Sequence, residues 1–203
     1  MEERYARQTM LPEIGEQGQR RLSEASVLIV GIGGLGSAAA LYLTGAGVGR
    51  IGLADADTVS KSNLQRQVLY TERQIGMPKS AAARERLAAL SSHTAFECWP
   101  EGITPENARP ILDGYDLILD CCDNFPTRYL LDDLCAACRK PWVHGSIGEF
   151  YGQVTVFNGR KGRRYRDLYP DRKALCARPR ITQGVLGTVP GVIGTLQASE
   201  AIK

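Results

Sequence analysis

The feature that most constrains the fold is an aliphatic run that leads into a glycine-rich turn, VLIVGIGGLG, residues 27–36. Gly31, Gly33 and Gly36 have the G-x-G-x-x-G spacing at which a buried strand turns into a helix while its backbone approaches a nucleotide. The next stretch, LGSAAALYLTGA at 35–46, has no charge, so we expect a helix buried against a sheet. The turn predicts a nucleotide-binding α/β fold but leaves the nucleotide open.

Hydrophobic patterning predicts that strands and helices alternate along the rest of the chain. We expect strands at 27–31, 50–54, 94–99, 116–121 and 142–146, and helices at 16–25, 35–46, 78–90, 105–112, 126–138 and 187–203. This order is typical of a Rossmann-like, doubly wound, mostly parallel α/β sheet. The stretch GQVTVFN, 152–158, alternates as an antiparallel strand does, and we expect it to extend the sheet.

The length of 203 residues, 43% of them hydrophobic, favours a single domain. We divide it into an N-terminal arm (1–25), a nucleotide-binding core (26–158), a basic crossover-type loop (159–183) and a C-terminal helix (187–203). The basic loop is predicted to be structureless, and so long a loop is functional or disordered. Its arginines and lysines form either a solvated surface or a docking surface for an acidic protein.

Composition excludes several classes of function. A net charge of +3 does not indicate a nucleic-acid partner. The start MEERYARQTM is polar and no apolar run is long enough for a membrane span, so we expect a cytoplasmic protein without a membrane partner. Six cysteines without a secretory framework are expected to be reduced. Cys135 and Cys138 form a C-x-x-C within a predicted helix, which favours core packing.

Asp55 follows Gly36 by 19 residues, at the end of the second predicted strand. A carboxylate there accepts a hydrogen bond from a ribose hydroxyl, which NAD and ATP both carry. Hydride transfer would also need an acid or base near the nicotinamide. The two histidines, His93 and His144, fall at a helix end and within a strand, where either can be inert. An NAD(P)-dependent oxidoreductase therefore remains an alternative.

Cationic and amide side chains follow the second strand in the loop DADTVSKSNLQRQ, 55–67. Asn63, Arg66 and Gln67 would lie beyond the carboxyl end of this strand, where open sheets bind ligands. Guanidinium and amide donors suit phosphate oxygens, although an arginine is also common in any surface loop.

Two further residues favour a polyphosphate. Lys79 follows Pro78 in a first helical turn, where the dipole disfavours a cation by tenths of a kcal/mol unless a phosphate is nearby. An ordinary surface lysine would tolerate that cost. Asp123 follows the strand DLILDC and either caps the helix at Pro126 or holds Mg²⁺ beside a polyphosphate. With the glycine turn and Asp55, these residues predict a nucleoside triphosphate site.

These motifs, with RYARQTMLPEIG near the start and GVIGTLQASEAIK near the end, resemble the ThiF/MoeB/HesA family of ubiquitin-activating-type adenylyltransferases. The resemblance extends from Arg4 over the whole chain. It implies ATP and Mg²⁺ as cofactors, and adenylation of the C-terminal glycine carboxylate of a ubiquitin-like sulfur-carrier protein ending in Gly-Gly. It also implies a role in thiamine, molybdopterin or related biosynthesis, with sulfur from a donor protein of the cysteine desulfurase or rhodanese type.

The resemblance implies roles for residues at matching positions. Those that would contact the nucleotide are Gly31, Gly33, Gly34 and Gly36 in the turn, Asp55 at the ribose, and Asn63, Arg66, Gln67 and Lys79 at the phosphates. Asp123 would hold the metal. Arg7 resembles the arginine that reaches into the site of another subunit, which implies a homodimer. Positioned cations would drive the transfer, and no general base is needed because the attacking carboxylate is already ionised.

Two departures from the family pattern stand out. Members often hold zinc with two C-x-x-C pairs, but Arg164 and Asp167 stand where the first pair would be, so we expect no zinc. Cys176 lies in the loop where some relatives carry a cysteine for sulfur chemistry, about four residues early relative to GVIGTLQ. Neighbouring arginines would favour its thiolate, and it would then act as a catalytic residue; the alternative is an incidental loop cysteine.

Two alternatives stay within the family's fold. A degenerate member would bind a carrier without activating it, and another kind would adenylate a peptide or a small molecule. The phosphate and metal residues at their expected positions argue against the degenerate binding module.

Overall fold

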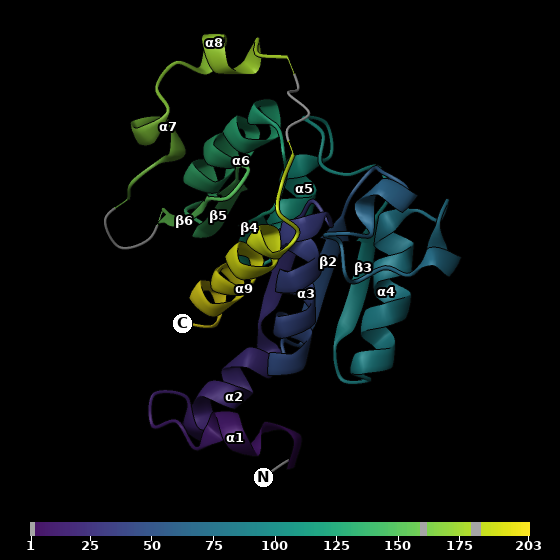
Figure 1. The fold of residues 1–203 in the computed structure, drawn as a ribbon. Helices are drawn as coiled ribbons and strands as arrows, with labels where there is room; N and C mark the ends of the chain where they lie inside the picture. Colours follow the sequence, from purple (N-terminus) through teal and green to yellow (C-terminus); the bar gives the residue numbers. More distant parts are fainter. Residues whose placement is uncertain (1–2, 159–161, 180–183) are drawn as a thin grey trace.

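A six-stranded sheet with the strand order β3-β2-β1-β4-β5-β6 forms the centre of the computed structural model, which describes residues 3–158, 162–179 and 184–203 (Figure 1). Its strands are β1 (Ser26–Val30), β2 (Arg50–Ala54), β3 (Ala95–Trp99), β4 (Leu117–Asp120), β5 (Trp142–Ile147) and β6 (Gly152–Phe157). The first five strands are parallel, and β6 runs antiparallel to β5. The predicted Rossmann-like sheet with an antiparallel extension is confirmed.

Helices cover both faces of the sheet. One face is covered by α3 (Gly34–Ala46), α4 (Lys79–Leu90) and α9 (Thr188–Ile202), and the other by α5 (Ala108–Asp113) and α6 (Phe125–Cys138). Strand β1 serves both layers, because Val27 and Ile29 belong to the core under α3 while Leu28 and Val30 belong to the core under α5 and α6. Successive side chains of a strand point to opposite faces, so a central strand must be apolar throughout.

The N-terminal arm packs at the end of the sheet where β1 begins (Figure 1). It consists of η1 (Glu3–Tyr5), α1 (Ala6–Thr9) and α2 (Gly15–Glu24). Gln8 and Gln19 donate hydrogen bonds of 3.1 and 2.9 Å to the carbonyl of Ala46, the last residue of α3. The arm is therefore tied to the end of α3 that lies farthest from the glycine turn.

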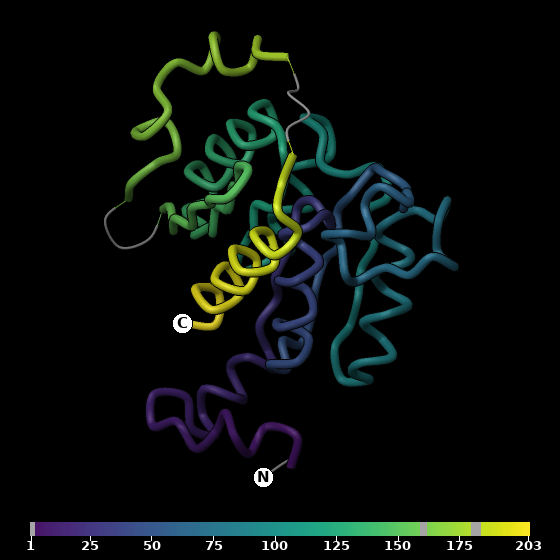
Figure 2. The backbone as a smooth tube through the Cα atoms, in the orientation of Figure 1, coloured from purple at the N-terminus to yellow at the C-terminus, as the bar shows by residue number. Residues whose placement is uncertain are grey.

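The segment for which the sequence predicts a structureless loop contains two short helices, α7 (Tyr165–Leu168) and α8 (Arg172–Cys176). Both pack against α6 and contribute to the core on the face opposite α9, and Figure 2 shows the yellow-green segment running around the outside of α6. The prediction is therefore wrong for 165–168 and 172–176, while 159–161 and 180–183 lie outside the described residues. No helix in the described part of the chain is long and apolar enough to cross a membrane.

Glycines allow α9 to pack closely against α3 and the turn before it. A Cβ at Gly194 would overlap the carbonyl oxygen of Leu35, and a Cβ at Gly34 would lie 2.8 Å from the Cβ of Pro190. Both contacts are shorter than real Cβ contacts, so a side chain at either position would force the helices apart. The start of α9 is thereby held beside the glycine turn.

We expect Gly194→Ala to lower the free energy of unfolding by about 2 kcal/mol, because the added methyl group meets backbone that cannot move independently. Gly191→Ala in the same helix is the matched control, since nothing lies within 4 Å of its added Cβ. That control should be neutral or stabilise by about 0.5 kcal/mol. Urea unfolding of both variants measures the difference, and equal effects would contradict the close approach.

Candidate active site

The glycine turn is held between the ends of β2 and β4. Gly31 has φ +91°, a left-handed conformation that favours glycine, and its N–H donates to the carbonyl of Ala54 at 2.8 Å. A Cβ at Gly31 would lie 2.7 Å from the carbonyl oxygen of Cys121, and one at Gly36 would overlap the Gly31 carbonyl. Both positions therefore require glycine, for conformation and for space.

Helix α3 begins directly after this turn without a side-chain cap. Its N-cap is Gly33, which offers no side chain to the first amides of a 13-residue helix. Gln67 faces the same turn, because a Cβ added at Gly33 would lie 3.5 Å from its Nε2. Gln67 is buried, and its Oε1 has no hydrogen-bond partner among the described residues. Uncapped amides, the positive end of the helix dipole and an amide side chain suit an anionic ligand.

Asp55 follows the last residue of β2 and faces the glycine turn. Its Oδ2 accepts a 2.6 Å hydrogen bond from the N–H of Ile32, and its Oδ1 accepts one of 2.8 Å from the N–H of Asp57. Burial raises the pKa of Asp55 above its usual range, and the charge of Lys79 acts in the opposite direction. Each carboxylate oxygen has capacity for a further hydrogen bond, as a ribose hydroxyl would require.

Lys79, the first residue of α4, is only 5% exposed. Its Nζ lies 2.9 Å from Oδ2 of Asp57 and 4.0 Å from Oδ2 of Asp55. Burial at this depth rules out an ordinary surface lysine, because an ammonium is rarely buried without charged partners. The structure therefore brings Lys79, Asp55, Gln67 and the glycine turn to one end of the sheet.

Asn63 and Arg66 lie on the loop between β2 and η3 (Glu72–Gln74). The side chain of Asn63 accepts from the N–H of Ser60 at 3.2 Å and closes η2 (Lys61–Asn63), while Arg66 donates to the carbonyl of Ser62 at 3.0 Å. The loop is joined to the glycine turn by the hydroxyl of Tyr70, which donates to the carbonyl of Ile32 at 2.7 Å. Phosphate contacts by Asn63 and Arg66 stay a prediction.

Asp123 is exposed on the loop between β4 and α6. The cap of α6 is its neighbour Asn124, whose Oδ1 accepts from the N–H of Thr127 at 2.9 Å, so the capping role proposed for Asp123 is filled. The preceding Cys121 borders Gly31, which places this loop beside the turn. Over the ranges that the structure describes, no three potential metal ligands cluster. A Mg²⁺ ion needs only one or two carboxylates when phosphates and waters complete its coordination.

Two predicted catalytic residues are not brought into this group. Arg7 lies on α1, at the C-terminal end of α3, whereas the glycine turn precedes the N-terminal end. The 13 residues of α3 separate the two ends by about 20 Å. Cys176 is the last residue of α8 and packs, half-buried, against the core beneath α6. Its proposed sulfur chemistry stays a prediction.

A buried polar network supports the loop that carries Asp123, and sequence reasoning did not identify it. Oδ2 of Asp120 lies 2.6 Å from Nδ1 of His144 and 3.7 Å from Nε of Arg128. Burial acts to raise the pKa of Asp120, but His144 and Arg128 hold it below its usual range. The available signal was an acid at the end of β4 and a histidine in β5, which are paired in register.

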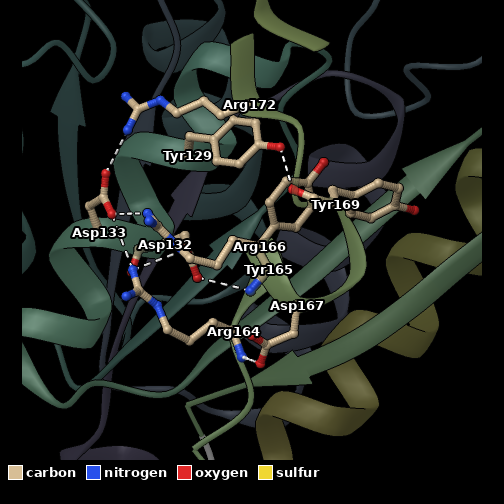
Figure 3. A network of polar contacts seen from close by, with 9 residues as sticks. All are labelled: Tyr129, Asp132, Asp133, Arg164, Tyr165, Arg166, Asp167, Tyr169 and Arg172. Carbon is tan, nitrogen blue, oxygen red and sulfur yellow. Dashed lines mark hydrogen bonds and ion pairs between the residues drawn. The ribbon is translucent and has the colours of Figure 1, made fainter. Parts of the chain in front are cut away.

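Arginines of the basic crossover-type loop form ion pairs and hydrogen bonds with two acids of α6 (Figure 3). Asp132 is fully buried and accepts from the N–H of Tyr165 at 2.9 Å and from Arg164 and Arg166 at 3.0 and 2.9 Å. The neighbouring Asp133 pairs with Arg164, Arg166 and Arg172. These three arginines are thus paired with acids of the same chain, while the docking surface considered from the sequence stays a prediction.

We expect Asp132→Asn to lower the free energy of unfolding by about 2 kcal/mol, since it removes the charge that two half-buried guanidiniums share. Asp133→Asn is the matched control. Its carboxylate is 39% exposed, so a loss of about 0.5 kcal/mol is expected. Urea unfolding, with limited proteolysis between Arg163 and Pro179, measures both effects. Equal protease resistance in wild type and Asp132→Asn would contradict an anchoring role.

Comparison with known proteins places the chain in one family. The family model described as "ThiF family" matches residues 5–203. The chain is 47% identical over 207 residues to a sulfur carrier protein adenylyltransferase of Thermus thermophilus, covering 99% of this chain and 76% of that protein. It is 49% identical over 205 residues to the adenylyltransferase and sulfurtransferase MOCS3 of Drosophila yakuba, covering 98% of this chain. It spans only 44% of that longer relative.

Solved structures show the same fold at lower identity. The structure of E. coli MccB with ATP has a TM-score of 0.87 and 23% identity, covering 100% of this chain and 63% of that chain. The E. coli tRNA N6-threonylcarbamoyladenosine dehydratase TcdA has a TM-score of 0.80 and 24% identity, covering 98% of this chain and 92% of its own.

Proposed function

The chain belongs to the ThiF family, and on this premise we propose that it uses ATP to adenylate the C-terminal carboxylate of a ubiquitin-like sulfur-carrier protein. The observation that carries the proposal is the convergence of the glycine turn, Asp55 and buried Lys79 at one end of the sheet. Identity of 47% to a sulfur carrier protein adenylyltransferase supports this choice of substrate.

The site fits ATP in charge and in hydrogen-bonding capacity. Asp55 has acceptor capacity for ribose hydroxyls, while two kinds of donor border the turn: the uncapped amides at the start of α3 and the Nε2 of Gln67. Lys79 and Arg66 would supply positive charge to the phosphates, as Asn63 and Gln67 would supply amide donors. The glycines allow the tight turn that would present backbone to the nucleotide, because a side chain at Gly31 or Gly36 would overlap the backbone of Cys121 or of Gly31.

Mg²⁺ fits the exposed carboxylate of Asp123, which follows β4 beside the turn. The ion would screen the charge of the phosphates when bound. The buried Asp120–His144 pair fixes the strand end from which this loop departs, so the chain itself would orient Asp123. We assign the metal to Asp123 and to no other side chain.

The reaction joins the carrier's terminal carboxylate to the α-phosphorus of ATP and releases pyrophosphate. The carboxylate is ionised at neutral pH and needs no base, so the barrier comes from bringing an anion to an already anionic phosphate. Lys79, Arg66 and the amides at the start of α3 would lower that repulsion without reorganising during the reaction. Catalysis would thus rest on positioning and electrostatics.

The alternatives considered from the sequence have less support. An NAD(P)-dependent oxidoreductase is disfavoured because the similar proteins are named adenylyltransferases, and because His144, one of the two histidines considered for hydride transfer, is fully buried and paired with Asp120. Adenylation of a peptide or small molecule is disfavoured, because identity is 47% to the carrier adenylyltransferase and 21–23% to the MccB structures.

We further propose a homodimer in which Arg7 completes the site of a second copy. In its own chain Arg7 lies at the far end of α3 from the glycine turn, so it can act on a nucleotide only in another subunit. The remaining assignments are a carrier that ends in Gly-Gly, a cytoplasmic setting, thiamine or molybdopterin synthesis, and sulfur from a donor protein. Cys176 would take part in the step that follows adenylation, in which a sulfur nucleophile attacks the acyl-adenylate and AMP leaves.

Wild-type protein should catalyse ATP–pyrophosphate exchange that is stimulated by a carrier ending in Gly-Gly. Asp123→Asn should abolish exchange because it removes the carboxylate that would hold Mg²⁺, and Lys79→Gln should lower it on the order of 100-fold because it removes positive charge at the transferring phosphate. Glu24→Gln is the control. It removes one negative charge, as Asp123→Asn does, but at an exposed position at the end of α2, so it should leave the rate unchanged. Absence of exchange with several such carriers would refute the proposed activity.

Mixing two inactive variants tests the composite site. Arg7→Ala and Lys79→Gln should each be inactive alone, whereas a re-equilibrated mixture should regain about one quarter of wild-type exchange activity, because each mixed dimer holds one intact site. Sedimentation should show a dimer for both variants. A mixture that forms dimers but stays inactive would exclude a contribution of Arg7 in trans.

A further inference from the structure

The ammonium of Lys79 lies at unequal distances from two carboxylates, those of Asp55 and Asp57. Its Nζ contacts Oδ2 of Asp57 at 2.9 Å but stays 4.0 Å from Oδ2 of Asp55, although Asp55 is the more deeply buried of the two acids. A buried ammonium gains most from the carboxylate with the poorest access to water. The longer distance to Asp55 therefore needs a cause, and Asp57 is the group in contact.

Asp57 is linked to both neighbours through its backbone as well. Its N–H donates to Oδ1 of Asp55 at 2.8 Å, and its carbonyl accepts from the N–H of Lys79 at 2.9 Å. These bonds fix Asp57 relative to the end of β2 and the start of α4. Its carboxylate is 67% exposed, so it can hold the ammonium at the solvent side of Asp55 at little desolvation cost.

We propose that Asp57 is a positioning residue that holds the ammonium of Lys79 away from Asp55, so that Asp55 keeps its acceptor capacity for a ribose and Lys79 faces the phosphates. This inference rests on the proposed function for its ligand, MgATP. Asp57 itself touches neither nucleotide nor carrier in this assignment and acts through Lys79.

The consequence of losing Asp57 follows from counting hydrogen bonds. Oδ2 of Asp55 already accepts from Ile32, so an ammonium in contact would occupy its second position. Only Oδ1 would keep capacity, and that atom already accepts from Asp57. Closing the Asp55–Lys79 pair would thus remove one of the two positions that Asp55 keeps for ribose hydroxyls, and it would also draw the cation away from the phosphates.

The ligand-free protein provides the first test. In a crystal structure of Asp57→Asn, Nζ of Lys79 should move into hydrogen-bond contact with Asp55, at about 2.9 Å. An asparagine keeps the backbone bonds and nearly the same shape but lacks the charge. If the distance stays at 4.0 Å, as in the wild type, the holding role of Asp57 is wrong. This result does not depend on any activity.

Calorimetric titration with MgATP provides the second test. Asp57→Asn should raise the Kd roughly fivefold, which corresponds to about 1 kcal/mol, whereas Glu24→Gln should leave it unchanged. Titration with Mg-2′,3′-dideoxy-ATP, which has no ribose hydroxyls to offer Asp55, should show a smaller loss in Asp57→Asn. An equal loss for both nucleotides would overturn the proposal, because Asp57 would then act on the phosphates alone.

A double-mutant cycle shows whether Asp57 acts through Lys79. In a Lys79→Gln background, Asp57→Asn should have no further effect on the Kd for MgATP. A full fivefold effect in that background would overturn the proposal. Thermal unfolding of all four proteins establishes that each is folded. If the wild type itself does not bind MgATP, the proposed function fails, and the crystal structure still decides the role of Asp57.

Discussion

The hydrogen bond from Gly31 N–H to the Ala54 carbonyl determines where the other groups of the candidate site lie. It extends the β1–β2 ladder by one residue and is made in a left-handed conformation, so the chain leaves the sheet at once and starts α3. Without a Cβ at Gly31, the loop after β4 closes against the same turn. The ends of β2 and β4, which carry the two acids assigned to ribose and metal, are thereby brought to one place.

Two acids at the ends of β2 and β4, Asp55 and Asp120, have their charge compensated in the same way. Asp55 is balanced by Lys79, and Asp120 by His144 and Arg128, so each buried acid has a cationic or protonatable partner from another element. A buried carboxylate without such a partner would cost several kcal/mol. The pairs therefore fix α4 relative to β2, and α6 and β5 relative to β4. If catalysis is electrostatic as proposed, the rigidity that it requires would come from these pairs.

Elements with a clear hydrophobic pattern were predicted well, because that pattern alone shows which of their residues are buried. Strand β2, at 50–54, was predicted with its observed bounds. The helix expected at 105–112 begins at Ala108 instead, because Thr104 and Asn107 bond each other before it. Helices α7 and α8 were not predicted, because they are stabilised by Asp132 and Asp133, some 30 residues earlier. In the site, the turn and Asp55 could be found from spacing, whereas Asp57 and Asp120 could not, because their roles depend on which strands are neighbours.

The two termini of α3 impose different requirements on the chain. At its start, glycines bring α9 and the loop 55–67 close to the turn, so one chain supplies most of the candidate site. At its end, Gln8 and Gln19 bind the arm to the carbonyl of Ala46 and keep Arg7 at the end of α3 farthest from the glycine turn. Helix α3 is about 20 Å long, so an arm bound to its end cannot bring Arg7 to the glycine turn at its start. If Arg7 acts on a nucleotide, a second chain must therefore present it, and catalysis would depend on assembly.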